Sequence, residues 1–267
     1  MAPAWIGVGL TDIGRVRKIN QDAFFLDNAI QLWIVADGMG GHAGGEIASQ
    51  ITVETIPTSF IAQRDGKSSN PIPAATLETL LVQAIESANQ RIREQASQNS
   101  EIKGMGTTVV AVAMTRTAGE SQAVIAHTGD SRAYVLRNKK LTLLTKDHTL
   151  MEERLALNLI TPDQVRTHPL RHVLTKALGI DPQAMPTVQT YKLEPTDVLL
   201  LCSDGLTKML TDPEIQTLML KEAPNLDRIT HTLVVTANRL GGEDNTTVVV
   251  IGADPDETLV DQPSTTA

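Results

Sequence analysis

The chain has 267 residues, 41% of them hydrophobic, and this composition predicts a soluble globular protein with a sizeable core. A net charge of −8 and an aromatic content of 3% argue against nucleic-acid binding, which needs a basic face and stacking side chains. No apolar stretch approaches the roughly 18 residues of a membrane-spanning helix, and the N-terminus does not look like a secretory signal. The single cysteine, Cys202, lies in an apolar run and is predicted to be a buried thiol in the reducing cytoplasm.

The first part of the chain predicts strands followed by helices. Alternating or continuous apolar residues predict strands over three ranges: 5–11, 23–26 and 32–36. Apolar residues at helical spacing predict helices over about 46–63 and 74–98. Pro57 is expected to kink or interrupt the first of these helices, because proline lacks a backbone N–H.

The remainder predicts more strands, two helices and a final strand. The strands are expected at 109–114, 122–127, 134–136, 188–193, 198–202 and 248–251, and the helices at 214–221 and 226–240. This order does not alternate strand with helix, so we expect an α+β fold, with two mainly antiparallel sheets face to face and helices outside. The segment 254–267 has four acidic residues, two prolines and no basic residue, which predicts a disordered acidic tail.

Between these strands, the segment 145–180 has a different character. A helix is predicted over about 151–159 and another starts at Thr161, where a capping residue precedes a proline. We therefore expect a small mobile helical subdomain. Its three histidines, His148, His168 and His172, are predicted to be ordinary polar surface residues rather than ligands.

Aspartates recur where strands begin or end. Asp37 follows the strand 32–36 and precedes Gly38, whose missing side chain would let its own carbonyl approach the same cation as the carboxylate. A single Asp-Gly pair is usually a plain turn. The recurrence is what favours a site, and it involves five residues: Asp22, Asp37, Asp130, Asp204 and Asp244. In antiparallel sheets such strand ends adjoin one another, so all five are expected at one edge.

Several carboxylates in close contact repel one another and take up protons unless a cation holds them, so this pattern predicts a metal centre. The candidate ligands are all oxygens, which favours Mg²⁺ or Mn²⁺ over Zn²⁺. Two such ions can share a bridging water, lower its pKa and direct it at phosphorus. Arg17 has the planar donor geometry that suits a phosphate. Neither Ser131 nor Ser203 lies in a Gly-x-Ser-x-Gly elbow, and there is no P-loop signature.

Six motifs together closely resemble the metal-dependent protein phosphatases of type 2C in their bacterial form. They are Arg17-Lys-Ile-Asn-Gln-Asp22, Val35-Ala-Asp37-Gly38-Met-Gly-Gly-His42, Gly106-Thr-Thr108, Thr128-Gly-Asp130-Ser-Arg132, Ser203-Asp204-Gly205-Leu206 and Glu243-Asp244-Asn245-Thr-Thr247. The match runs in order from about residue 5 to 253. The resemblance implies a single catalytic domain over 1–253, a four-layer α-β-β-α sandwich, and a flap subdomain at about 145–180. It also implies hydrolysis of phosphoserine and phosphothreonine by metal-activated water.

The resemblance also implies roles for individual residues. Asp37, the Gly38 carbonyl, Asp204 and Asp244 would hold two metal ions, with Asp37 bridging. Asp22 would act through metal-bound water and Arg17 would bind phosphate. Asp130 with Asp204 would hold a third, weaker ion. His42 matches the histidine proposed as proton donor to the leaving oxygen, and the alternative is a histidine that only hydrogen-bonds near the metals.

One departure from the family pattern lies in the flap, where Asn158 occupies a place at which relatives commonly have glycine. Asparagine also tolerates the left-handed conformation, so the turn is expected to survive. The implied partners are phosphoproteins, the substrates of bacterial-type serine/threonine kinases, and we expect a monomer that binds neither nucleic acid nor membrane. Two alternatives stay open at this point: an inactive relative that binds phosphoproteins, and a two-metal nuclease or phosphodiesterase, which would need a basic groove.

Overall fold

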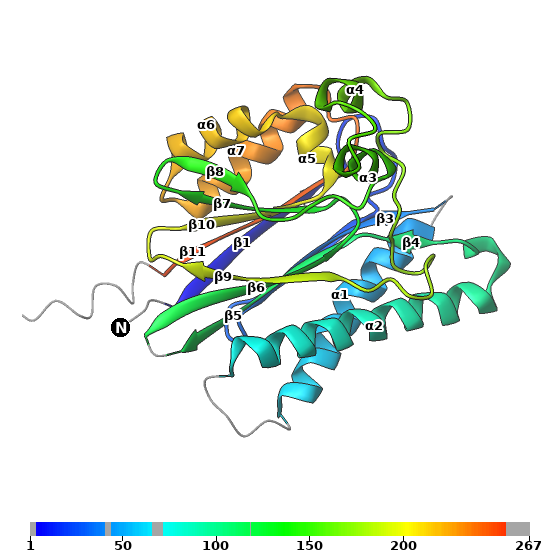
Figure 1. The fold of residues 1–267 in the computed structure, drawn as a ribbon, viewed down its shortest axis with the longest axis horizontal. Helices are drawn as coiled ribbons and strands as arrows, with labels where there is room; N and C mark the ends of the chain where they lie inside the picture. The colour runs from blue at the N-terminus through cyan, green and yellow to red at the C-terminus, as the bar shows by residue number, and fades with distance from the viewer. Residues whose placement is uncertain (1–3, 41–43, 66–71, 118, 255–267) are drawn as a thin grey trace, which may run out of the picture.

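The computed structural model describes residues 4–40, 44–65, 72–117 and 119–254. These residues form four layers, in which two antiparallel sheets pack face to face and helices cover the outer side of each (Figure 1). The predicted α-β-β-α architecture is thereby confirmed. The acidic segment 255–267 and His42 lie outside the described residues.

The first sheet takes its strands from both ends of the chain. Its order is β1 (Trp5–Asp12), β11 (Thr246–Ala253), β10 (Val198–Cys202), β7 (Arg132–Arg137) and β8 (Lys140–Leu143). The strand β11, which lies between β1 and β10, is apolar along almost its whole length because both its faces are covered. Val249 and Ile251 face the second sheet, while Val248 and Val250 face the helices.

The second sheet is built around the first Asp-Gly strand. Its order is β2 (Asp22–Asp27), β3 (Leu32–Met39), β5 (Val109–Thr117), β6 (Glu120–Thr128) and β9 (Thr187–Leu193), and the two-residue β4 (Gly106–Thr107) pairs with the end of β3. Trp33 on β3 is completely buried between the two sheets. Its indole Nε1 donates a hydrogen bond of 3.0 Å to the Asn28 side chain in the turn that joins β2 to β3.

Helices cover the outer faces of both sheets. The second sheet is covered by α1 (Gly44–Asp65) and α2 (Ala74–Gln98), and a short 3₁₀ turn, η1 (Ser100–Ile102), follows them. The first sheet is covered by α5 (Asp204–Met209), α6 (Asp212–Glu222) and α7 (Leu226–Arg239). Of the two effects expected of Pro57, a kink or an interruption, the interruption does not occur, since α1 continues through it. No helix in the described ranges has the length and apolarity needed to cross a membrane.

The segment between β8 and β9 contains α3 (Leu150–Ala156) and α4 (Pro162–Thr167), which lie together at one end of the sandwich (Figure 1). The predicted cap of α4 is present. The Thr161 hydroxyl accepts a hydrogen bond from the Gln164 backbone N–H, and the Gln164 side chain accepts one from the Thr161 N–H. Asn158 has a φ of 56°, so it does adopt the left-handed conformation expected of it.

Candidate metal centre

The strand ends bring the predicted aspartates together at the end of the sandwich that carries α3 and α4. In the β2–β3 pair, Asp22 lies directly opposite Asp37. Asp204 lies two residues after the end of β10 and begins α5, and Asp244 lies two residues before β11. Asp130 lies in the short connection from β6 to β7, which crosses from one sheet to the other. The expected gathering at one edge is therefore observed.

A cavity of about 430 Å³ opens at this edge. The carboxylates of Asp37, Asp130, Asp204 and Asp244 line it, together with Arg17, Gly38 and Lys208. The segment 145–180 supplies another part of its wall through His172, Leu174, Lys176 and Ile180. The cavity is therefore lined by carboxylates from the strand ends and by basic and apolar side chains from the segment 145–180.

Asp22 lies beneath the cavity rather than in its wall. One of its oxygens, Oδ2, accepts hydrogen bonds from the Ser203 hydroxyl at 2.7 Å and the Thr247 hydroxyl at 2.7 Å. Burial raises the pKa of Asp22 to about 7, against the opposing effect of these two hydrogen bonds. Because Ser203 immediately follows β10 of the first sheet, Thr247 lies on β11 of the same sheet and Asp22 lies on β2 of the second, this cluster ties the two sheets together.

The backbone of Asp37 is fixed by the Gly-Thr-Thr motif. Its carbonyl accepts hydrogen bonds from the Thr107 hydroxyl at 2.9 Å and the Thr108 backbone N–H at 2.8 Å. Its own N–H donates to the Thr108 hydroxyl at 3.1 Å. Burial, followed by the charges of Asp22 and Asp204, raises the pKa of the Asp37 carboxyl well above its ordinary value.

Gly38 is a glycine for a steric reason that the sequence did not indicate. A Cβ at this position would lie 2.0 Å from the carbonyl oxygen of Gly45 in the first turn of α1, and 2.6 Å from the Gln21 carbonyl oxygen. The Gly38 N–H donates to that same Gln21 carbonyl at 3.0 Å. The absence of a side chain therefore lets the start of α1 and the end of β3 meet beside the carboxylates.

The prediction that His148 is an ordinary surface residue is wrong. Its ring stacks on that of the buried His127 with 4.6 Å between the centroids, and its Nδ1 accepts a hydrogen bond from the Gly129 N–H. Burial, and then the charge of His127, lowers the pKa of His148 to about 4. Through Gly129, His148 anchors the connection that carries Asp130, whose own pKa burial raises to about 7.

The remaining two carboxylates are held by cations of the chain itself. The Lys208 ammonium lies 2.6 Å from Asp204 Oδ2 and 2.7 Å from Asp244 Oδ2. The Arg17 guanidinium lies 2.8 Å from the same Asp244 oxygen. Because of Lys208 and Arg17, the pKa of Asp244 is lowered in spite of its burial.

Lys208 is the functional residue that the sequence reasoning missed. It lies four residues after Asp204, the spacing at which side chains of a helix meet. The helix that creates this contact, α5, was not predicted, because six residues are too few to show a periodic pattern. The Asp-to-Lys spacing was nevertheless a signal in the sequence.

The residues present fit a hard divalent cation. The side-chain donors are carboxylate oxygens, which Mg²⁺ and Mn²⁺ prefer. Asp204 Oδ1 is buried and has no hydrogen-bond partner among the described residues. In the same part of the chain, no three acidic, histidine or cysteine side chains are arranged around one point. The Lys208 ammonium lies between two of these carboxylates, those of Asp204 and Asp244.

Comparisons with known proteins agree with this geometry. Residues 14–237 match the model of the family described as protein phosphatase 2C. A serine/threonine phosphatase, stp, of Listeria welshimeri serovar 6b is 36% identical over 244 residues, which cover 90% of this chain and 93% of that protein.

Two solved structures extend this comparison. The serine/threonine phosphatase PstP/Ppp of Mycobacterium tuberculosis has a TM-score of 0.81 and 33% identity, over 94% of this chain and 99% of the other. A catalytic domain of PstP in complex with two manganese ions has a TM-score of 0.77 and 32% identity, over 94% of this chain and 99% of the other.

Proposed function

The chain belongs to the protein phosphatase 2C family and is a serine/threonine protein phosphatase, and we propose that its reaction takes place in the cleft lined by Asp37, Asp204 and Asp244. The observation that carries this proposal is the convergence of these carboxylates, from both sheets, with Arg17 on one cavity. We propose that the Asp37 carboxylate, the Gly38 carbonyl, Asp204 and Asp244 would hold two metal ions.

Three further assignments belong to this proposal. Asp22 acts through water, which suits its position beneath the cavity. Asp130 and Asp204 hold a third, weaker ion. Mg²⁺ and Mn²⁺ are the proposed ions, and the complex of a related catalytic domain with two manganese ions supports Mn²⁺. When bound, such ions activate water for attack on phosphorus and neutralise charge on the phosphoryl oxygens.

The chain's own residues bind and orient the substrate phosphate. Arg17 is about half exposed, and its guanidinium contacts the carboxylate cluster at Asp244. Its remaining N–H donors suit the oxygens of a phosphate dianion, for which guanidinium is a bidentate partner. Another part of the wall, from the flap at about 145–180, contributes Lys176 and Ile180 to the cleft. We propose that this wall contacts the residues flanking the phosphorylated side chain.

The proposed substrates are phosphoserine and phosphothreonine in proteins modified by bacterial-type serine/threonine kinases. We further propose that the protein acts in the cytoplasm as a monomer, with residues 1–253 as one catalytic domain. The alternative is an inactive protein that binds phosphoproteins. Such a protein would have lost catalysis while retaining all the carboxylates and Arg17. A nuclease is disfavoured, since acidic groups line the cleft.

The test is release of phosphate from a phosphothreonine peptide in Mn²⁺, in Mg²⁺ and in chelator. We expect turnover that depends on the metal and falls to the chelator level in Asp37→Asn. Asp227→Asn, which neutralises an exposed aspartate in the first turn of α7, is the matched control and should retain turnover. Metal binding without turnover by the unmodified chain would contradict the proposal and favour the binding protein.

A further inference from the structure

Lys208 lies between two of the proposed metal ligands, Asp204 and Asp244. Its ammonium lies within 2.7 Å of one oxygen from each of Asp204 and Asp244, and the three side chains are mostly buried, with exposed fractions of 23%, 16% and 15%. In such surroundings an ion pair is screened less by water and salt than at the surface. The contact is therefore a substantial interaction rather than a loose surface pair.

The same two oxygens are proposed ligands of a divalent cation. A divalent ion bound by Asp204 Oδ2 and Asp244 Oδ2 would occupy the region that the Lys208 ammonium occupies, and two positive centres there would repel each other. Lys208 must therefore leave both oxygens before they can act as ligands. Lys208 also lines a cavity of about 590 Å³ that includes Asp204 and Asp244 themselves, and the other carboxylates of that lining include Glu152 and Glu243.

We propose that Lys208 is an internal counter-ion that holds Asp204 and Asp244 together in the absence of metal and lowers the affinity of the centre for divalent cations. This inference rests on the proposed function, since it takes Asp204 and Asp244 as ligands. It has two consequences of opposite sign. Removing the ammonium strengthens metal binding, because nothing has to be displaced. It also destabilises the protein in chelator, because the two carboxylates then repel each other.

The experiment compares the full chain with Lys208→Met, which keeps the length of the side chain and removes its charge. Mn²⁺ affinity is measured by isothermal titration calorimetry after treatment with chelator and dialysis, and the thermal midpoint Tm is measured in chelator. We expect Lys208→Met to bind Mn²⁺ about tenfold more tightly, which is about 1.4 kcal/mol, and to unfold about 2 °C or more lower in chelator.

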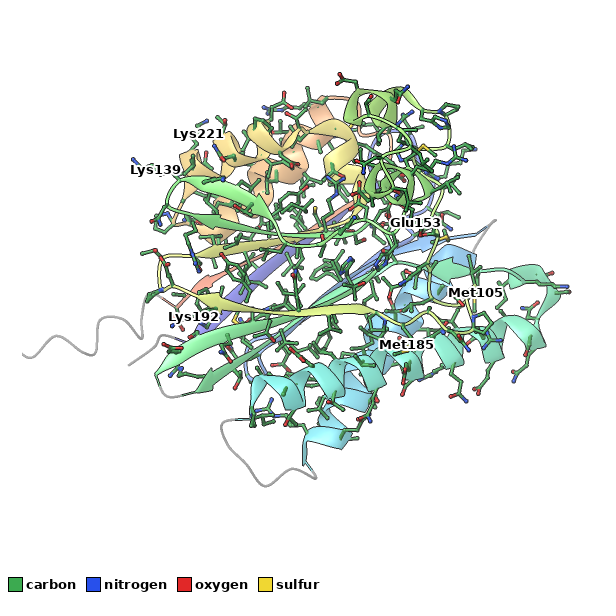
Figure 2. The ribbon with its side chains drawn as sticks, in the orientation of Figure 1. Met105, Lys139, Glu153, Met185, Lys192 and Lys221 are labelled. Atoms are coloured by element: carbon green, nitrogen blue, oxygen red, sulfur yellow. The ribbon has the colours of Figure 1, made fainter. Side chains whose placement is uncertain are left out.

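Lys192→Met is the matched control, because Lys192 also pairs with a carboxylate, Glu120, but lies far along β9 from the flap helices (Figure 2). It should change neither measurement. If Lys208→Met does not fold, Lys208→Gln is measured in its place and the same tighter binding is expected. An affinity for Mn²⁺ that is unchanged or weaker in the variant overturns the proposal.

The outcomes also separate this inference from the proposed function. Tighter Mn²⁺ binding by Lys208→Met, with no phosphatase activity in any form of the chain, would support the counter-ion and refute the catalytic assignment. Failure of all forms to bind Mn²⁺ would overturn the counter-ion as well, since Lys208 would then have no cation to compete with. Phosphate release by the unmodified chain together with an unchanged affinity in the variant would refute the counter-ion alone.

Discussion

The hydrogen bonds beneath the site make a quantitative prediction for Ser203→Ala. The Ser203 hydroxyl is completely buried, donates to Asp22 Oδ2 at 2.7 Å and accepts from the Thr247 backbone N–H at 3.0 Å. Loss of a hydrogen bond to a charged group costs about 1.5–3 kcal/mol, and a buried N–H left without a partner costs about 1–3 kcal/mol. Since Thr247 Oγ1 still donates to Asp22, we expect the free energy of unfolding to fall by about 3 kcal/mol in total.

The assay is urea unfolding in chelator at pH 8, where Asp22 is largely ionised. Ser121→Ala is the matched control, because Ser121 is also buried but its hydroxyl has no hydrogen-bond partner within the described ranges. The control should change the free energy of unfolding by less than about 0.5 kcal/mol. Equal losses in the two variants would refute the reasoning, since the effect would then come from the removed oxygen's volume rather than from its hydrogen bonds.

Three other outcomes are expected. Asp197→Ala should lower the free energy of unfolding by about 3–5 kcal/mol in urea, because the fully buried Asp197 carboxylate is the partner of the Arg137 guanidinium, and an unchanged value would contradict this. Gly38→Ala should abolish metal-dependent phosphate release and lower Tm, because its Cβ would lie 2.0 Å from the Gly45 carbonyl oxygen; normal turnover would show that α1 can move away. The lowered pKa of His148, about 4 against an ordinary 6.5, means that the unfolded chain takes up the proton first. The free energy of unfolding should therefore fall as the pH drops from about 6.5 toward 4. Between pH 7.5 and 5, and after allowance for solvent screening, the free energy of unfolding of His148→Asn should fall by about 1 kcal/mol less than that of the unmodified chain. Urea unfolding at each pH measures this difference.

The part of the site that could be predicted from the sequence is the part set by strand direction. Asp22 and Asp37 flank the predicted strands 23–26 and 32–36, and antiparallel pairing of these strands makes the two aspartates neighbours, as they are. The Asp204 and Asp244 positions follow from the same rule applied to β10 and β11. The spacing of the apolar residues predicts these strands, and the residue at which each apolar run ends predicts where the aspartate lies.

The parts that could not be predicted depend on short elements and on contacts between sheets. The strand β8 (Lys140–Leu143) is short and polar, and the two residues of β4 are fewer than any periodic pattern needs. The sequence placed Asp130 between two strands but could not show that β6 and β7 belong to different sheets, since consecutive strands usually pair. The hydrogen bond between His148 and the Gly129 N–H could not be predicted either, because it depends on how the segment 145–180 packs against the connection from β6 to β7.

The two sheets together make the site, because neither supplies a complete set of carboxylates. Asp22 and Asp37 come from the second sheet, Asp204 and Asp244 from the ends of strands in the first. Their separation is set by the apolar layer between the sheets, in which Trp33 is the largest fully buried side chain. Protein interiors are close-packed, so a change of volume in that layer shifts one sheet against the other. Substitutions between the sheets should therefore alter metal affinity without touching a ligand, whereas substitutions under α6 and α7, which carry none of the proposed ligands, should alter stability alone.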